Sequence, residues 1–133
     1  MAKILIVEDD LRFALCIQHE VELLGHEVVG PVECADAAII ASAEHRPDLV
    51  LMDVNIDGSM DGIDTAHKLH ADYQLPVIFL TSACDDLTIS RAVQETPYGY
   101  LIKPFKRHDL KAAIQLALHN AGVNAAAECL AKR

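Results

Sequence analysis

The sequence has no uninterrupted apolar run of the roughly 18 to 20 residues that a membrane-spanning helix needs. It is also poor in basic residues, since 11 lysines and arginines stand against 20 aspartates and glutamates, for a formal net charge of −9. Nucleic-acid binders concentrate basic side chains to neutralise phosphates, so direct contact with DNA or RNA is not expected. The chain turns acidic too soon after Met1 for a signal peptide. These absences predict a cytoplasmic globular domain without membrane contacts.

Two further kinds of site lack their sequence signatures. The four cysteines form no CxxC pair and have no metal-type spacing with histidine. Cys16 and Cys34 lie in apolar stretches, where we expect them to behave as small core residues. Neither a GxGxxG nor a GxxxxGK loop is present, which argues against a nucleotide site. The acidic surplus suits a protein that binds cations or basic partner surfaces.

Short apolar runs alternate with amphipathic segments along the whole chain. The runs typical of strands cover residues 3–7, 27–32, 49–52, 77–80 and 99–102. The segments with helical spacing cover residues 11–24, 35–45, 62–71, 85–95 and 108–119. Gly30 and Pro31 weaken the second strand and place it towards a sheet edge. Strands that alternate with helices need crossover connections, so the pattern predicts an α/β fold with a parallel sheet covered on both faces.

The boundary of the domain is expected near residue 120. Residues 1–120 contain all the predicted strands and helices, while residues 121–133 are rich in alanine and include Gly122. This last segment could extend the final helix, form a short separate helix or be the stump of a linker.

Each strand that could reach the centre of such a sheet is followed by polar side chains. They are Glu8, Asp9 and Asp10 after the first strand, Asp53 after the third, Thr81 and Ser82 at the fourth, and Lys103 after the fifth. Ligands bind outside the carboxyl ends of parallel strands, so these groups should meet in one crevice. Any one of them alone is as well explained by a helix cap or a solvated turn. Their occurrence at four separate strand ends favours a functional site.

The chemistry of this set points to phosphoryl transfer. Several converging carboxylates repel one another unless a cation neutralises them. Mg²⁺ is suited to the task, because it prefers one or two carboxylates, waters and a phosphate oxygen. Asp53, facing Mg²⁺ and Lys103, would then be placed to attack phosphorus and form an aspartyl phosphate. The metal, Lys103 and the Thr81 hydroxyl would stabilise the charge on the transferred oxygens.

Five segments of the chain resemble the receiver domain of bacterial response regulators, of the chemotaxis-regulator kind. They are Ile4–Asp10, Pro47–Asp53, Met60–Gly62, Pro76–Thr81 and Lys103–Phe105, and the resemblance runs from residue 3 to about residue 119. It implies a flavodoxin-like (βα)5 three-layer sandwich with strand order 2-1-3-4-5. The segment after Asp53 departs from the common pattern, since residues 55–59 lack the usual proline and form a longer connection.

The resemblance also implies a role for each site residue. Asp53 would be the phosphoacceptor. Mg²⁺ would be held by Asp9 directly, by Glu8 through water, by Asp53 and by the backbone carbonyl of Asn55. Thr81 and Lys103 would contact the phosphoryl oxygens, and the Lys103–Pro104 peptide would be cis. Thr81 and Tyr100 would form the switch, and the less favoured alternative for Tyr100 is a half-buried strand aromatic.

The implied activity is that of a signalling receiver, which catalyses only its own phosphorylation and dephosphorylation. Its phosphoryl donor would be a histidine kinase or a histidine phosphotransfer protein. Its output could be a homodimer through the fourth helix, fifth strand and fifth helix, or binding to another target. The chain could be a stand-alone receiver or a fragment of a longer regulator or hybrid kinase.

Two alternatives come from other classes of protein. A haloacid-dehalogenase-type phosphatase also forms an aspartyl phosphate, but it needs Asp-x-Asp where this chain has Asp53-Val54-Asn55. A receiver-like module that binds proteins without phosphorylation would be favoured by a missing acceptor or lysine, and both residues are present.

Overall fold

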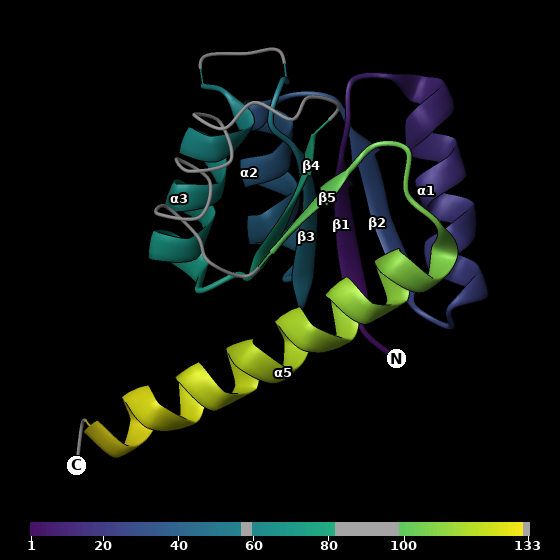
Figure 1. Cartoon of the computed structure of the whole chain (residues 1–133). Coiled ribbons are helices and arrows are strands. Elements are labelled where there is room, and N and C mark those ends of the chain that lie inside the picture. The colour runs from purple at the N-terminus through teal and green to yellow at the C-terminus, as the bar shows by residue number, and fades with distance from the viewer. Residues whose placement is uncertain (57–59, 82–98, 132–133) are drawn as a thin grey trace.

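Strands and helices alternate through the described part of the chain (Figure 1). The computed structural model describes residues 1–56, 60–81 and 99–131, with side chains as far as Gly122. Its elements are β1 (Lys3–Val7), α1 (Leu11–Leu23), β2 (Glu27–Val32), α2 (Ala35–His45), β3 (Leu49–Asp53), α3 (Gly62–Tyr73), β4 (Val77–Thr81), β5 (Tyr100–Ile102) and α5 (Arg107–Ala131). The helix predicted over residues 85–95 lies outside the described residues.

All five strands form one parallel sheet in the order β2-β1-β3-β4-β5. This confirms the predicted α/β class and the strand order that the resemblance implied. β2 lies at the edge of the sheet, as Gly30 and Pro31 suggested, and its pairing with β1 is irregular between Leu5 and Val7. The central strands stay in register to their ends, where Val7 pairs with Met52 and Asp53 pairs with Leu80.

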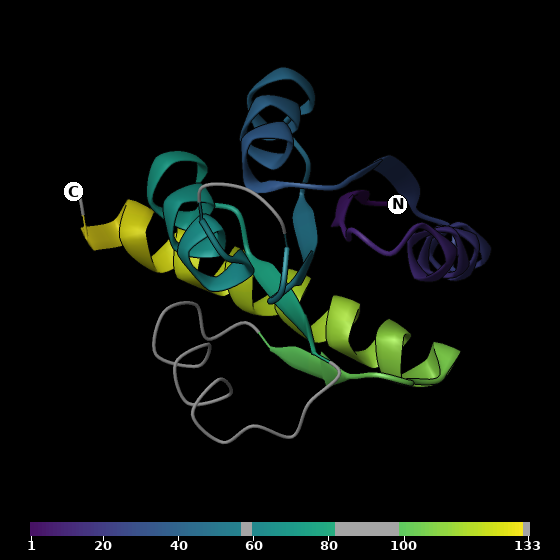
Figure 2. The ribbon, with the colours of Figure 1, turned by 90° about the horizontal axis from the view of Figure 1, so that it is seen from above.

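Helices cover both faces of the sheet and give three layers (Figure 2). Alternate residues of each strand point to opposite faces, so Leu5 and Val7 pack towards α2 and α3, while Ile4 and Ile6 pack towards α1 and α5. α1 buries Ala14, Ile17 and Val21, the stripe predicted from its spacing. The predicted three-layer sandwich is confirmed by these two cores.

The structure decides one open alternative and contradicts one expectation about helical residues. The final helix begins at Arg107 and runs to Ala131, so residues 121–131 extend it, which is one of the three alternatives left open for that segment. Its 25 residues span about 37 Å, roughly twice the length of a strand in the sheet, and its C-terminal half projects past the sheet (Figure 1). Cys16 is exposed, because it falls between the buried positions of α1 and off their stripe.

No helix within the described residues is both long enough and apolar enough to cross a membrane.

Gly62, the first residue of α3, packs against the backbone that carries Asp53. Its N–H donates to the carbonyl of Val54 at 3.0 Å. A Cβ at this position would lie 2.0 Å from the carbonyl oxygen of Asp53 and 2.8 Å from Cα of Val54. Backbone atoms cannot yield as a flexible side chain can, so only glycine lets α3 approach the end of β3.

We therefore predict that Gly62→Ala lowers the free energy of unfolding by about 3 kcal/mol, the upper end of the usual range for overpacking. Gly122→Ala is the matched control, because nothing lies within 4 Å of its Cβ position in α5. There alanine should raise helix stability by up to about 1 kcal/mol. Urea unfolding of the two variants measures both effects, and equal stabilities would contradict the packing argument.

Candidate functional site

The carboxyl ends of β1, β3 and β5 bring three charged side chains together. Lys103 Nζ donates to Glu8 Oε1 at 2.7 Å and to Asp53 Oδ2 at 3.4 Å. Carboxylate oxygens of Glu8, Asp9 and Asp53 all lie within 4.8 Å of one another. The group opens into a cleft of about 580 Å³ lined by Glu8, Asp9, Asp10, Phe13, Asp53, Asn55, Lys103 and Pro104. Of the predicted strand-end residues, the structure places Glu8, Asp9, Asp10, Asp53 and Lys103 in one crevice.

Asp53 is held in place by the strand that precedes it. It is the last residue of β3, whose five residues are all buried, and its own side chain is nearly inaccessible to solvent. The backbone N–H of Asn55 donates to Asp53 Oδ1 at 3.0 Å, which fixes the orientation of the carboxylate. The other oxygen, Oδ2, faces Lys103. One oxygen is therefore occupied by the backbone and the other faces a cation.

Glu8 is the most deeply buried charged group of the site. The pairing of β1 with β2 continues one residue past Val7, because the Glu8 N–H donates to the carbonyl of Val32 at 2.9 Å. Its Oε1 accepts from Lys103, whereas Oε2 is buried without a hydrogen-bond partner. Burial and the hydrogen bond with Asp53 raise the pKa of Glu8 to about 8, against the opposing effect of Lys103.

Lys103 reaches the acidic groups from the opposite side of the cleft. Its backbone N–H donates to the Thr81 carbonyl at 2.7 Å, which continues the β4–β5 pairing by one residue. The Lys103–Pro104 peptide bond is cis, the geometry that the resemblance implied. The side chain is mostly buried, and Nζ also lies 4.3 Å from the centroid of the Phe13 ring. Lys103 therefore has two carboxylates and one aromatic face around its ammonium group.

The residues present fit a divalent cation. Three oxygen-donating carboxylates converge, and one of them carries a buried oxygen that no protein group satisfies. A hard cation with oxygen ligands would offset both the repulsion between the carboxylates and the isolation of Glu8 Oε2. Receiver domains generally bind Mg²⁺ at such an acidic pocket, and the donor chemistry of this cleft agrees with that ion.

The other predicted residues differ in their relation to the cleft, which Asn55 and Asp10 line. Thr81 is buried at the end of β4, and Asn55 is exposed at the rim. Asp10 caps α1, since its side chain accepts from the N–H groups of Arg12 and Phe13. Tyr100 begins β5 with 42 % of its surface exposed. Ser82 lies outside the described residues.

Two residues of this region were not found by sequence reasoning. Phe13 lines the cleft from α1, and Gly62 packs on the backbone of Asp53. The site was predicted from polar residues directly after strands, whereas Phe13 is an apolar residue on a helix. Its position over Lys103 depends on how α1 packs against the sheet. Gly62 stood beside the capping Asp61 in a recognised segment, but its contact with β3 could only be found in three dimensions.

Fold and site together define a class of protein. A family model for the response regulator receiver domain matches residues 4–115 of the chain. The chain therefore belongs to the response-regulator receiver domain family.

Particular relatives are similar over most of the chain. The transcriptional regulatory protein PdtaR of Mycobacterium tuberculosis is 33% identical over 116 residues, which cover 87% of this chain and 56% of PdtaR. The DNA-binding response regulator MtrA of the same species is 35% identical over 118 residues, covering 87% of this chain and 50% of MtrA. A solved signal receiver domain of a modulated diguanylate cyclase from Desulfovibrio desulfuricans gives a TM-score of 0.87 at 35% identity, covering 93% of this chain and 98% of that one. The chain spans about half the length of these two curated relatives.

The raised pKa of Glu8 predicts that the metal-free domain loses stability as pH rises. In the unfolded chain the carboxyl has its ordinary pKa of 4.5, whereas in the folded chain the pKa is about 8. Between these values only the folded state keeps the proton, so stability falls by at most about 1.4 kcal/mol per pH unit and levels off above pH 8. Urea unfolding in the presence of EDTA from pH 5 to pH 9 measures this slope.

Glu8→Gln should remove this component, because glutamine does not titrate. Glu22→Gln, on the exposed face of α1, is the matched control and should keep the wild-type slope. Equal slopes in wild type and Glu8→Gln would show that Glu8 does not hold the proton.

Proposed function

We propose that this chain is a phosphoacceptor receiver in a cytoplasmic two-component phosphorelay. In this proposal Asp53 takes a phosphoryl group from a phosphohistidine of a histidine kinase or a histidine phosphotransfer protein. The observation that carries the proposal is the Asp53 side chain, with one oxygen fixed by a backbone N–H and the other facing Lys103 at 3.4 Å. A nucleophilic carboxylate beside a fixed cation is the arrangement that acyl phosphate formation requires.

The residues of the cleft divide the transfer among them. Asp53 attacks the phosphorus, so that an oxygen–phosphorus bond forms as the phosphorus–nitrogen bond of the donor histidine breaks. Lys103, within reach of Asp53, neutralises charge on the phosphoryl oxygens, and the Thr81 hydroxyl binds a further oxygen. Glu8, Asp9, Asp53 and the Asn55 carbonyl would hold Mg²⁺, which when bound supplies charge neutralisation for the transferred group.

A partner can reach this cleft from the side of α1. Leu11 and Leu15 are exposed on the first two turns of the helix, directly after the acidic segment that ends with Asp10. Leu11 and Leu15 are four residues apart and share one face of α1, so they form a small exposed apolar surface of the kind that protein partners contact. They support an approach of the phosphohistidine protein over the N-terminal end of α1.

The proposed output is a change in a protein-interaction surface. Thr81 would move towards the new phosphoryl group, and Tyr100, now partly exposed at the start of β5, would turn inward. Tyr100, Ile102 and Leu116 are exposed apolar residues of β5 and α5. They support a phosphorylation-dependent homodimer through this surface. The net charge of −9 supports an output without direct nucleic-acid contact by this domain.

Intact mass after treatment with phosphoramidate tests the acceptor. We expect a gain of one phosphoryl group that depends on Mg²⁺ and is absent in Asp53→Asn. Asp72→Asn is the matched control, because Asp72 is an exposed helical aspartate whose ion pair with Lys68 adds little stability. It should take up phosphate as the wild type does.

Acid-labile phosphate on Asp53→Asn would overturn the assignment of the acceptor. A wild-type chain that folds normally but gains no mass would favour the phosphorylation-independent interaction module instead.

Sedimentation of the phosphorylated chain tests the homodimer. The mass should rise from the 14.5 kDa of one chain towards twice that value on phosphorylation. Leu116→Glu should prevent the rise, because it places a charge in the apolar contact. Ile40→Glu is the control, since Ile40 is as exposed on α2 (57 %) as Leu116 is on α5 (58 %). A dimer that tolerates Leu116→Glu would remove α5 from the interface.

A further inference from the structure

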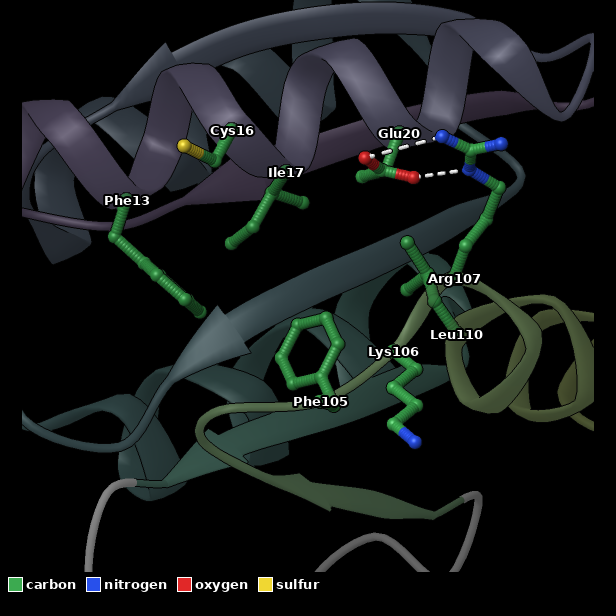
Figure 3. Close-up of a pocket in the computed structure, with 8 residues that line it drawn as sticks. All are labelled: Phe13, Cys16, Ile17, Glu20, Phe105, Lys106, Arg107 and Leu110. Carbon is green, nitrogen blue, oxygen red and sulfur yellow. Dashed lines mark hydrogen bonds and ion pairs between the residues drawn. The ribbon is translucent and has the colours of Figure 1, made fainter.

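Phe13 lines two neighbouring cavities of the domain. It lines the acidic cleft and also a groove of about 400 Å³ between α1 and the start of α5 (Figure 3). The groove is apolar in the middle, where Ile17, Phe105 and Leu110 lie, and the ion pair between Glu20 and Arg107 crosses it at one end. Among the described residues that line the two cavities, Phe13 is the one that belongs to both.

The ring of Phe13 supports the ammonium group of the site lysine. Lys103 Nζ lies 4.3 Å from the ring centroid, well within the range of a cation–π interaction. The side chain of Lys103 is only 17 % exposed, so water competes little for this contact. The ammonium thus has attractive groups on three sides, with Glu8 at 2.7 Å, Asp53 at 3.4 Å and the ring of Phe13.

Phe13 makes two further contacts, one through its backbone and one through its ring. The backbone N–H of Phe13 donates to the capping carboxylate of Asp10 at 3.4 Å, in the first turn of α1. On the groove side, the rings of Phe13 and Phe105 have centroids 5.7 Å apart and planes at 82°, the edge-to-face arrangement that aromatic pairs favour. Phe13 therefore has both a fixed backbone and an aromatic neighbour.

An aromatic face suits a lysine that must change partners. A hydrogen bond to Glu8 or Asp53 holds the ammonium in one direction, whereas attraction to a ring face depends weakly on which N–H points at it. Lys103 can turn from Glu8 to a new acceptor beside Asp53 and keep its contact with Phe13. An aliphatic residue in this place would fill the same space without attracting the charge.

We propose that Phe13 is a positioning residue, which holds the Lys103 ammonium beside the acceptor carboxylate through its ring face. The inference rests on the proposed function of Asp53 as the phosphoacceptor. Phe13 acts through Lys103 and is not itself in contact with the phosphoryl group.

The position of the lysine is tested first, by NMR of the full chain with labelled lysines and no phosphodonor. The Cε protons of Lys103 should be shifted upfield by the ring current of Phe13. Phe13→Leu should abolish the shift and Phe13→Tyr should keep it. Phe105→Leu is the packing control, because leucine keeps an apolar side chain against the groove side of Phe13 while the ring that faces the ammonium stays.

The consequence for the reaction is tested with phosphoramidate and Mg²⁺, by the rate at which the intact mass increases. Phe13→Leu should slow the reaction by about 3- to 10-fold, the effect of losing a partly desolvated cation–π contact. Phe13→Tyr and Phe105→Leu should stay within about twofold of wild type. In a Lys103→Met background, Phe13→Leu should not lower the rate further. A residue that acts only through the lysine has no effect once the lysine is replaced.

Three results would overturn the inference. They are a Lys103 shift that survives Phe13→Leu, a Phe105→Leu variant as slow as Phe13→Leu, and an additional loss from Phe13→Leu in the Lys103→Met background. If the wild type takes up no phosphoryl group, the proposed function fails, and the NMR comparison still decides whether Phe13 holds the lysine.

Discussion

Repulsion between two buried carboxylates is the constraint on which the rest of this site depends. Glu8 and Asp53 end neighbouring parallel strands, so the register of β1 and β3 forces them together in a place that water hardly reaches. Lys103 offsets part of that repulsion from the end of β5, 50 residues after Asp53 and 95 after Glu8. Burial, the hydrogen bond with Asp53 and the repulsion that remains raise the pKa of Glu8 to about 8, against the opposing effect of Lys103, and one Glu8 oxygen has no hydrogen-bond partner. A proton on Glu8 relieves this repulsion, and a bound divalent cation would relieve it as well.

The surrounding structure keeps these charges from relaxing apart. Asp53 cannot swing away, because its strand is buried and the Asn55 N–H holds one of its oxygens. Gly62 lets α3 pack directly on the Asp53 backbone, and the Lys103 N–H continues the β4–β5 pairing by donating to the Thr81 carbonyl. Rigid elements therefore hold these charges close together, as the proposed binding of a cation and a phosphoryl group requires.

Much of the fold could be predicted from the local spacing of apolar residues. In α1 they recur every three or four residues, as in a helix, and in β1, β3 and β4 they form short continuous runs, as in buried strands. Prediction failed at one position of α1 and left the end of the last helix open. Cys16 sits in an apolar stretch, yet it turns to the surface between buried neighbours of α1. The last helix continues to Ala131, since nothing in an alanine-rich segment ends a helix and the one glycine, Gly122, does not break it.

The sequence by itself determined which chemical groups end the strands, and hence that Asp53, Glu8, Asp9 and Lys103 would share one edge of a parallel sheet. That followed from chain direction alone, because parallel strands bring all their carboxyl ends to the same side. Only the tertiary structure decided the environment of those groups. The burial that raises the pKa of Glu8 depends on the register between strands that are far apart in sequence. The position of the Phe13 ring over Lys103 depends on how α1 packs against the sheet. Such distances arise from packing between elements, and no local pattern of residues contains them.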